Sequence, residues 1–146
     1  MKKRIRSLIA GVLLAGSTSA FSCGEIIVTG VVDGDTLRAE MVGMPDNLKK
    51  VSIRIMGIDT PEIHGKCDSE KEKAREAKEF LRTKLLATRA VTFKWMEWDK
   101  YGGRILAEVY FDGEDVSKLM IDSGLAVEYH GEKKSGHWCL TTSQEP

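Results

Sequence analysis

The sequence predicts an α+β, mainly β fold: a five-stranded Greek-key barrel with an amphipathic helix after the third strand and a short helix near the C-terminus. Two observations carry this prediction. Five apolar runs, separated by turn signals rich in Gly and Asp, are typical of strands, and several of them alternate with period two. One longer stretch instead repeats its apolar residues every three or four positions, which is typical of a helix packed on a sheet.

The first three strands are expected in the N-terminal half of the chain. Glu25–Val32 and Thr36–Met41 are apolar-rich runs, and the turn signal Asp33-Gly34-Asp35 between them predicts a β-hairpin. A third run, Val51–Met56, alternates aliphatic with other residues. Arg54 is therefore expected to point away from the face that carries its aliphatic neighbours.

The long helix is expected over residues 69–87. Ser69 is expected to cap its start, with Glu72 as the capping-box partner. Lys and Glu fill the positions between the apolar ones, and we interpret this charge as a solvated face. The apolar stripe consists of Ala74, Ala77, Phe80, Leu81 and Leu85.

A second hairpin and a short helix complete the pattern. Val91–Trp95 and Ile105–Phe111 are expected to pair around the turn Asp99–Gly103. Asp115–Ser123 predicts a helix that Gly124 can end. Five strands with a helix after the third is the order of an OB-type barrel.

The N-terminus has the pattern of a secretory signal peptide. Basic residues precede the apolar run Leu8–Ala15 and the small residues Gly16–Ala20, so cleavage is expected after Ala20, with no membrane anchor left and a periplasmic or secreted protein as the result. The expected organisation is a signal peptide over 1–20, a flexible N-terminus over 21–24, one domain over 25–130 and a tail over 131–146.

Charge excludes one way of binding nucleic acid. The whole chain has 22 Lys+Arg and 22 Asp+Glu, and without residues 1–20 it has 18 against 22, a net charge of about −4. A protein that coats nucleic acid through bulk positive charge would be basic. Any such contact must therefore come from a local group of residues or through a metal ion.

Three cysteines allow one disulfide in an exported chain. Cys67 and Cys139 are the preferred pair, because Cys23 lies beside the expected cleavage site. The sequence alone permits all three pairings.

Two short segments place carboxylates at strand ends, Asp33–Thr36 and Asp59–Glu62. Carboxylate oxygens are hard ligands that suit calcium or magnesium, whereas the histidines and cysteines lack the spacing of a zinc site. The alternating oxygen ligands of a helix–loop–helix calcium site are also missing. Each segment alone is an ordinary turn or helix start, so the information lies in their joint occurrence.

Together with a third segment they resemble the staphylococcal nuclease (thermonuclease) family. The segments are Val32–Thr36, Arg54–Glu62 and Asp99–Ala107, and the likeness extends from about Ile26 to Val127 in the same order. The resemblance implies a calcium-dependent endonuclease that hydrolyses phosphodiester bonds of DNA and RNA with little sequence specificity and leaves 3′-phosphate ends. We expect a monomer.

The resemblance also implies roles for single residues. By it, Asp35, Asp59 and the carbonyl of Thr60 bind calcium, and Asp33 supports that site. Glu62 is the implied general base, and Arg54 and Arg104 the implied phosphate-binding pair, since a guanidinium grips two phosphate oxygens at once. Lys100 and Tyr101 match positions that touch a nucleotide's terminal phosphate.

The chain departs from the family pattern in two places. Gly102-Gly103 makes the turn before Arg104 one residue longer, and a bulge in the strand is expected to absorb the extra residue. The family's long C-terminal helix is expected to be absent, with Tyr129 standing in for a nucleotide-contacting tyrosine.

Aromatic residues offer one further expectation about substrate contact. Trp95 falls on the apolar face of its strand and is expected in the core, so Trp98 is the better candidate for stacking on a base.

Two other function classes remain open: an OB-fold binding module without catalysis, and a secreted calcium-binding structural domain. The first is expected to have lost the carboxylates and arginines, and the second gives no reason for the arginines.

Overall fold

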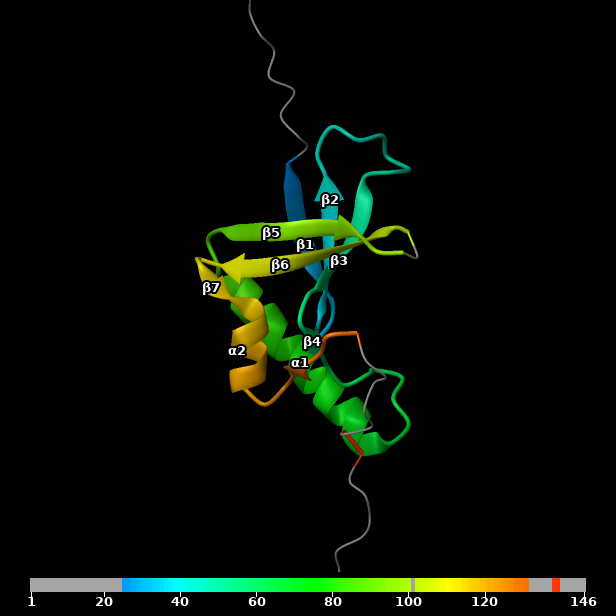
Figure 1. Ribbon diagram of the computed structural model, residues 1–146, viewed down its shortest axis with the longest axis vertical. Coiled ribbons are helices and arrows are strands. Elements are labelled where there is room, and N and C mark those ends of the chain that lie inside the picture. Colours follow the sequence, from blue (N-terminus) through cyan, green and yellow to red (C-terminus); the bar gives the residue numbers. More distant parts are fainter. Residues whose placement is uncertain (1–24, 101, 132–137, 140–146) are drawn as a thin grey trace, which may run out of the picture.

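The structure is a computed structural model that describes residues 25–100, 102–131 and 138–139. It is mainly β-sheet with two helices, as the sequence predicts (Figure 1). The elements are β1 (Ile26–Asp33), β2 (Thr36–Met41), β3 (Lys50–Ile55), β4 (Ile58–Asp59), α1 (Asp68–Ala87), β5 (Val91–Trp98), β6 (Arg104–Phe111), β7 (Glu114–Asp115), α2 (Val116–Asp122) and β8 (Val127–Glu128).

The main sheet has the strand order β1-β2-β3-β6-β5, with β7 paired to β6. Neighbouring strands are antiparallel except β3 and β6, which are parallel. A second sheet consists of β4 and β8. In the described part of the chain no ladder joins the edge strands β1 and β5, so the expected closed five-stranded barrel is not confirmed in that detail.

The five long strands follow the predicted runs closely; β1, β2, β3 and β6 contain buried side chains, whereas β5 has only partly buried and exposed ones. In β6, for example, Ile105, Ala107, Val109 and Phe111 are buried while their neighbours are only partly covered. The helix α1 covers the open end of this core with the small side chains Ala74 and Ala77 and with Leu81 (Figure 1). Burial of this apolar surface is the main stabilising contribution to the fold.

The predicted cap of α1 is wrong. The helix begins at Asp68, its N-cap residue is Cys67, and no side chain caps it. Ser69 lies inside the first turn, where its Oγ donates to the carbonyl of Trp138 at 3.0 Å. The short helix behaves as expected: the Asp115 side chain accepts hydrogen bonds from the first-turn amides, and Gly124, at φ 72°, follows its end.

The prediction that Trp95 belongs to the core is also wrong. The β5–β6 register shifts between Lys94 and Glu97, and Trp95 adopts φ 46° with 78% of its surface exposed. Such an insertion interrupts the alternation of side chains that the prediction assumed. The residue therefore faces solvent.

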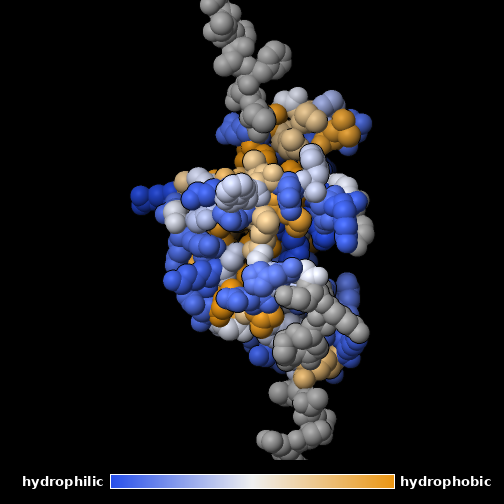
Figure 2. Space-filling view, viewed as in Figure 1, coloured by the Kyte–Doolittle hydropathy of each residue, from blue (hydrophilic) through white to orange (hydrophobic). Residues whose placement is uncertain are grey.

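The visible surface mixes polar and apolar residues, with hydrophobic ones on the loop that joins β2 and β3 (Figure 2). Met44 and Leu48 of this loop are exposed. Among the described residues no helix combines the length and the apolar character needed to cross a membrane.

Candidate active site

The turn between β1 and β2 is pressed against α1 and against the segment after β4. A Cβ placed on Gly34 would lie 2.8 Å from the Cβ of Ala77 and 3.0 Å from Oγ1 of Thr60, which is too close for any side chain. This close approach brings the first carboxylate segment onto the second, although 25 residues separate Asp35 from Thr60.

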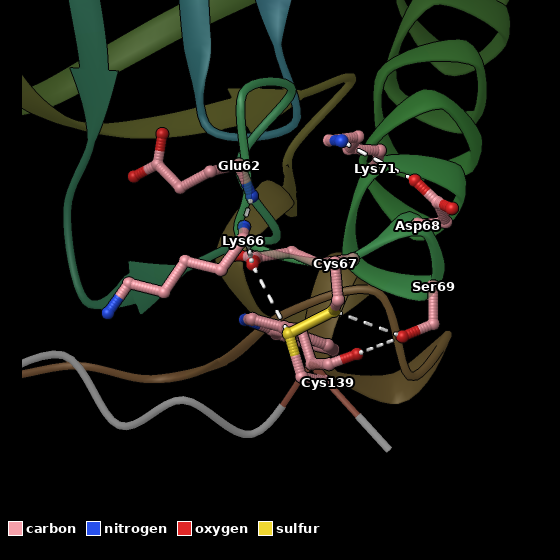
Figure 3. The surroundings of a disulfide bond; sticks show 9 residues. Glu62, Lys66, Cys67, Asp68, Ser69, Lys71 and Cys139 are labelled. Atoms are coloured by element: carbon pink, nitrogen blue, oxygen red, sulfur yellow. Dashed lines mark hydrogen bonds and ion pairs between the residues drawn. A yellow bond between two sulfur atoms is a disulfide. The ribbon is translucent and has the colours of Figure 1, made fainter. Parts of the chain in front are cut away.

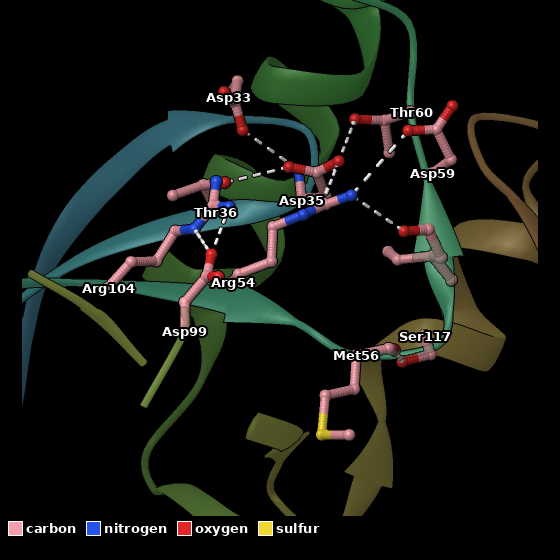
Figure 4. Close-up of polar contacts among 11 residues, drawn as sticks. Asp33, Asp35, Thr36, Arg54, Met56, Asp59, Thr60, Asp99, Arg104 and Ser117 are labelled. Atoms are coloured by element: carbon pink, nitrogen blue, oxygen red, sulfur yellow. Dashed lines mark hydrogen bonds and ion pairs between the residues drawn. The ribbon is translucent and has the colours of Figure 1, made fainter. Parts of the chain in front are cut away.

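Asp35 lies at the centre of the resulting polar cluster and is only 7% exposed. Its Oδ1 accepts a hydrogen bond from Oγ1 of Thr36 at 2.9 Å, and its Oδ2 accepts one from Oγ1 of Thr60 at 3.0 Å. Nη1 of Arg54 forms an ion pair with the same Oδ2 (Figure 4). Both carboxylate oxygens are therefore fixed in direction.

Arg54 reaches the cluster from β3, on the side opposite the buried Val51, Ile53 and Ile55, as its alternation predicts. Its Nη2 donates to the carbonyl of Ile58 at 3.1 Å and lies 3.7 Å from Oδ1 of Asp59, which is 4% exposed. The guanidinium thus bridges two carboxylates that come from different segments.

Arg104 enters from β6 and is held by Asp99. Its Nε donates to Oδ2 of Asp99 at 2.6 Å, and its Nη2 contacts the same oxygen (Figure 4). Gly102 and Gly103, at φ 71° and 66°, lie in the longer turn. The strand pair has a register shift between Lys94 and Glu97, away from this turn, so the bulge expected to absorb the extra residue stays a prediction.

Sequence reasoning assigned Asp99 only to a turn and missed this contact. The predicted hairpin could have indicated this contact, because Asp99 and Arg104 lie on either side of its turn. In the structure the Asp99 amide also donates to the Arg104 carbonyl at 2.9 Å.

Five of the predicted site residues, Asp35, Arg54, Thr60, Glu62 and Arg104, line one cavity of about 100 Å³. Both arginines and the predicted general base are among its lining residues. Asp59 does not line the cavity but lies next to Arg54, which does. Lys100 is exposed and is not part of the lining, and Tyr101 lies outside the described residues. The lining consists of Asp33, Asp35, Thr36, Arg54, Thr60, Pro61, Glu62 and Arg104.

Glu62 lies in an exposed loop that is anchored on both sides. Pro61 before it is fully buried, and the Glu62 amide donates to Oε1 of Glu70 at 3.4 Å. The other oxygen of Glu70 accepts from the amide of Lys66 at 2.9 Å. The first turn of α1 therefore fixes the backbone of the loop, while the Glu62 side chain faces the water-accessible cavity.

A disulfide fastens the other end of this loop. Cys67 bonds to Cys139, which confirms the preferred pairing, and joins the start of α1 to a segment 72 residues away (Figure 3). Trp138 next to it is 8% exposed, and its carbonyl accepts the hydrogen bond from Ser69. The loop that carries Glu62 is thus tied to the end of the chain.

The cavity concentrates negative charge. Burial, followed by the negative charge of Asp35, raises the pKa of Asp33 from 3.8 to about 6. Hard oxygen donors are what Ca²⁺ and Mg²⁺ prefer. The carboxylates of Asp35 and Asp59, which both contact Arg54, supply oxygen donors that fit such an ion.

Comparisons with known proteins agree with this chemistry. The family described as Staphylococcal nuclease homologue matches residues 52–144. An uncharacterized endonuclease of Escherichia coli is 34% identical over 103 residues, which cover 70% of this chain and 59% of the relative. A probable endonuclease of Schizosaccharomyces pombe is 36% identical over 101 residues, covering 64% and 42%, respectively. The chain thus spans less than two thirds of the length of these relatives.

Proposed function

This chain belongs to the staphylococcal nuclease homologue family, and from that premise we propose that it is an exported, calcium-dependent endonuclease that hydrolyses phosphodiester bonds in DNA and RNA. One observation carries the proposal: Arg54, Glu62 and Arg104, from three separate segments, line the same cavity as Asp35. A structural calcium site gives no reason for the two arginines, and a binding module without catalysis gives no reason to keep the carboxylates. The two arginines beside a solvent-facing glutamate are what hydrolysis of a phosphodiester requires.

Asp35, Asp59 and the carbonyl of Thr60 would hold the calcium ion, with Asp33 supporting the site. When bound, the ion would neutralise charge on the phosphate that is attacked. Thr36 and Thr60 keep the Asp35 carboxylate in a fixed orientation, which would hold its oxygens in place for a cation.

Glu62 is the proposed general base. Hydrolysis needs a water molecule to lose a proton as its oxygen attacks phosphorus, and a carboxylate within hydrogen-bond reach can accept that proton. Glu62 is exposed on the cavity wall, whereas Asp35 and Asp59 are buried and paired with Arg54. Its position separates the proton acceptor from the proposed cation ligands.

Arg54 and Arg104 are proposed to bind the phosphate and the charge that develops on it in the transition state. A planar guanidinium donates to two phosphate oxygens at once and remains protonated at any pH the enzyme meets. The ion pair with Asp99 holds Arg104 at the cavity before substrate arrives. Such preorganised donors lower the barrier because they need not reorient during the reaction.

The remaining parts of the proposal rest on the resemblance and on the sequence. We propose little sequence specificity, 3′-phosphate products, and contact of Lys100 and Tyr101 with a terminal phosphate. We also propose a monomer that is exported to the periplasm or medium by a leader over residues 1–20, which lies outside the described residues.

The test is cleavage of single-stranded DNA and of RNA by the purified protein in calcium, in magnesium and in EDTA. Cleavage of both substrates in calcium, abolished by EDTA and weaker in magnesium, is the expected result. Tight binding of oligonucleotides with no cleavage in any condition would favour a binding module instead.

A further inference from the structure

A second pocket on the molecule is built around Trp95. The register shift between Lys94 and Glu97 places this residue at φ 46°, a conformation that bulky side chains rarely adopt, and leaves its indole 78% exposed. The pocket has a volume of about 270 Å³ and is lined by Met56, Trp95, Met96, Glu97 and Glu108. A backbone outlier that exposes a large aromatic ring is a reason to look for a ligand.

Shared lining residues relate this pocket to the candidate active site. Met56 also lines a neighbouring hollow of about 400 Å³, whose wall includes Leu106 and Tyr129, and that hollow in turn shares Arg54 with the catalytic cavity. Figure 4 shows Met56 on the far side of Arg54 from Asp33. Each of the three hollows therefore adjoins the next at a shared side chain.

We propose that the Trp95 pocket binds a nucleobase of a single-stranded substrate at a distance from the bond that is cleaved. This inference rests on the proposed function, because the adjoining hollows give a bound strand a path from Arg54 to Trp95. The indole offers a flat face for stacking, and Met56 and Met96 add apolar surface around it.

The charges of the pocket favour a base over a phosphate. Glu97 and Glu108 carry negative charge into it and would repel a phosphate group. The hydroxyl of Tyr110 donates to Oε2 of Glu108 at 3.1 Å, and Nζ of Lys94 lies 4.4 Å from the centroid of the Tyr110 ring. The ammonium group of Lys94, the residue next to Trp95 in the sequence, is thus engaged with this ring.

Carboxylate oxygens accept hydrogen bonds from the amino groups of bases. Cytosine, adenine and guanine carry such a group, whereas thymine and uracil do not. The pocket is therefore expected to prefer amino-bearing bases over thymine and uracil. It is also expected to require single-stranded substrate, because in a duplex the faces of the bases are stacked and their amino groups are paired.

The test is equilibrium binding of fluorescently labelled oligonucleotides in calcium by the protein carrying Glu62→Gln, which prevents cleavage during the measurement. Adding Trp95→Ala is expected to weaken binding of a twelve-residue oligo-dC about 10-fold, the usual effect of losing one stacked base. A labelled dinucleotide, which occupies only the catalytic cavity, is expected to bind equally well to both proteins.

Three further variants make the result specific. Leu86→Ala is the control, because Leu86 is a large apolar residue that is 76% exposed on α1 and does not line the pocket. It is expected to bind as the parent does, and Trp95→Phe is expected to restore most of the affinity. Glu108→Gln is expected to reduce the preference for oligo-dC over oligo-dT.

The inference would be overturned if Trp95→Ala bound oligo-dC as tightly as the parent does. It would also be overturned if Trp95→Ala weakened dinucleotide binding as much as oligo-dC binding, or if the parent bound no oligonucleotide. Its failure is distinguishable from that of the proposed function. Binding that depends on Trp95 in a protein whose intact active site cleaves nothing would overturn the nuclease alone, and cleavage without dependence on Trp95 would overturn the pocket alone.

Discussion

Nη1 of Arg54 contacts Oδ2 of Asp35, one of the two carboxylates proposed to bind calcium. The same guanidinium lies 3.7 Å from Asp59, the other one. The arginine is thus a cation that contacts both of these carboxylates. On the proposed assignment, calcium would compete with Arg54 for their oxygens, and calcium binding would free the guanidinium for a phosphate.

The first prediction follows from this competition. Arg54→Ala is expected to bind calcium about 10-fold more tightly, because no charged hydrogen bond has to be displaced, while cleavage falls by orders of magnitude. Isothermal titration calorimetry measures the affinity, and Arg38→Ala, an exposed arginine of β2 outside the cavity, is the control. Unchanged or weaker calcium binding by Arg54→Ala would contradict the competition.

The second prediction concerns the pair of Asp99 and Arg104. Asp99→Asn keeps the size of the side chain but removes the charge that holds the guanidinium, so the turnover number is expected to fall about 10-fold. In a protein that already carries Arg104→Ala, the same change is expected to have little further effect. Steady-state kinetics of the four proteins test this, and a full additional loss in the double variant would show that Asp99 acts independently of Arg104.

The third prediction concerns the disulfide between Cys67 and Cys139. It closes a loop of 72 residues, and its removal is expected to lower the free energy of unfolding by about 2–4 kcal/mol. Urea unfolding of the wild type with and without reducing agent measures the loss. Cys139→Ser is the control, since its stability is expected to be low and unaffected by the reductant. If reduction left the unfolding midpoint of the wild type unchanged, this role of the disulfide would be wrong.

The fourth prediction concerns the backbone at Trp95. Glycine adopts φ 46° without a steric penalty, so Trp95→Gly is expected to be about 1 kcal/mol more stable than Trp95→Ala. Both variants lose the same exposed indole, and the comparison therefore isolates the backbone. Thermal unfolding of the pair gives the answer, and equal stability would mean that Trp95 is not held in this conformation in solution.

The parts of the fold that could be predicted from sequence are those set by local patterns. The hairpin around Gly34 and the helix that contains Leu81 each follow from a period in the sequence and a turn signal. The prediction for Trp95 fails because a bulge inserts a residue and reverses the faces of the strand. The Ser69 hydroxyl does not cap the helix because it donates a hydrogen bond to the Trp138 carbonyl.

The residue types of the candidate site could be predicted from sequence, but the contacts between them could not. The motifs give the residue types, and the resemblance gives their roles, but the contact between Asp35 and Thr60 depends on how the turn at Gly34 packs against α1. No period in the sequence encodes that approach. The hydrogen bond between Arg104 and Asp99 likewise depends on the geometry of the second hairpin.

Glu62 is the proposed general base of a calcium-dependent phosphodiesterase. The most direct test is the rate of cleavage of single-stranded DNA in saturating calcium by the wild type, by Glu62→Gln and by Glu76→Gln, the same change on an exposed residue of α1. We expect Glu62→Gln to lower the turnover number by about 10²–10⁴-fold with calcium affinity unchanged, and Glu76→Gln to match the wild type. Wild-type turnover by Glu62→Gln would show that Glu62 is not the general base.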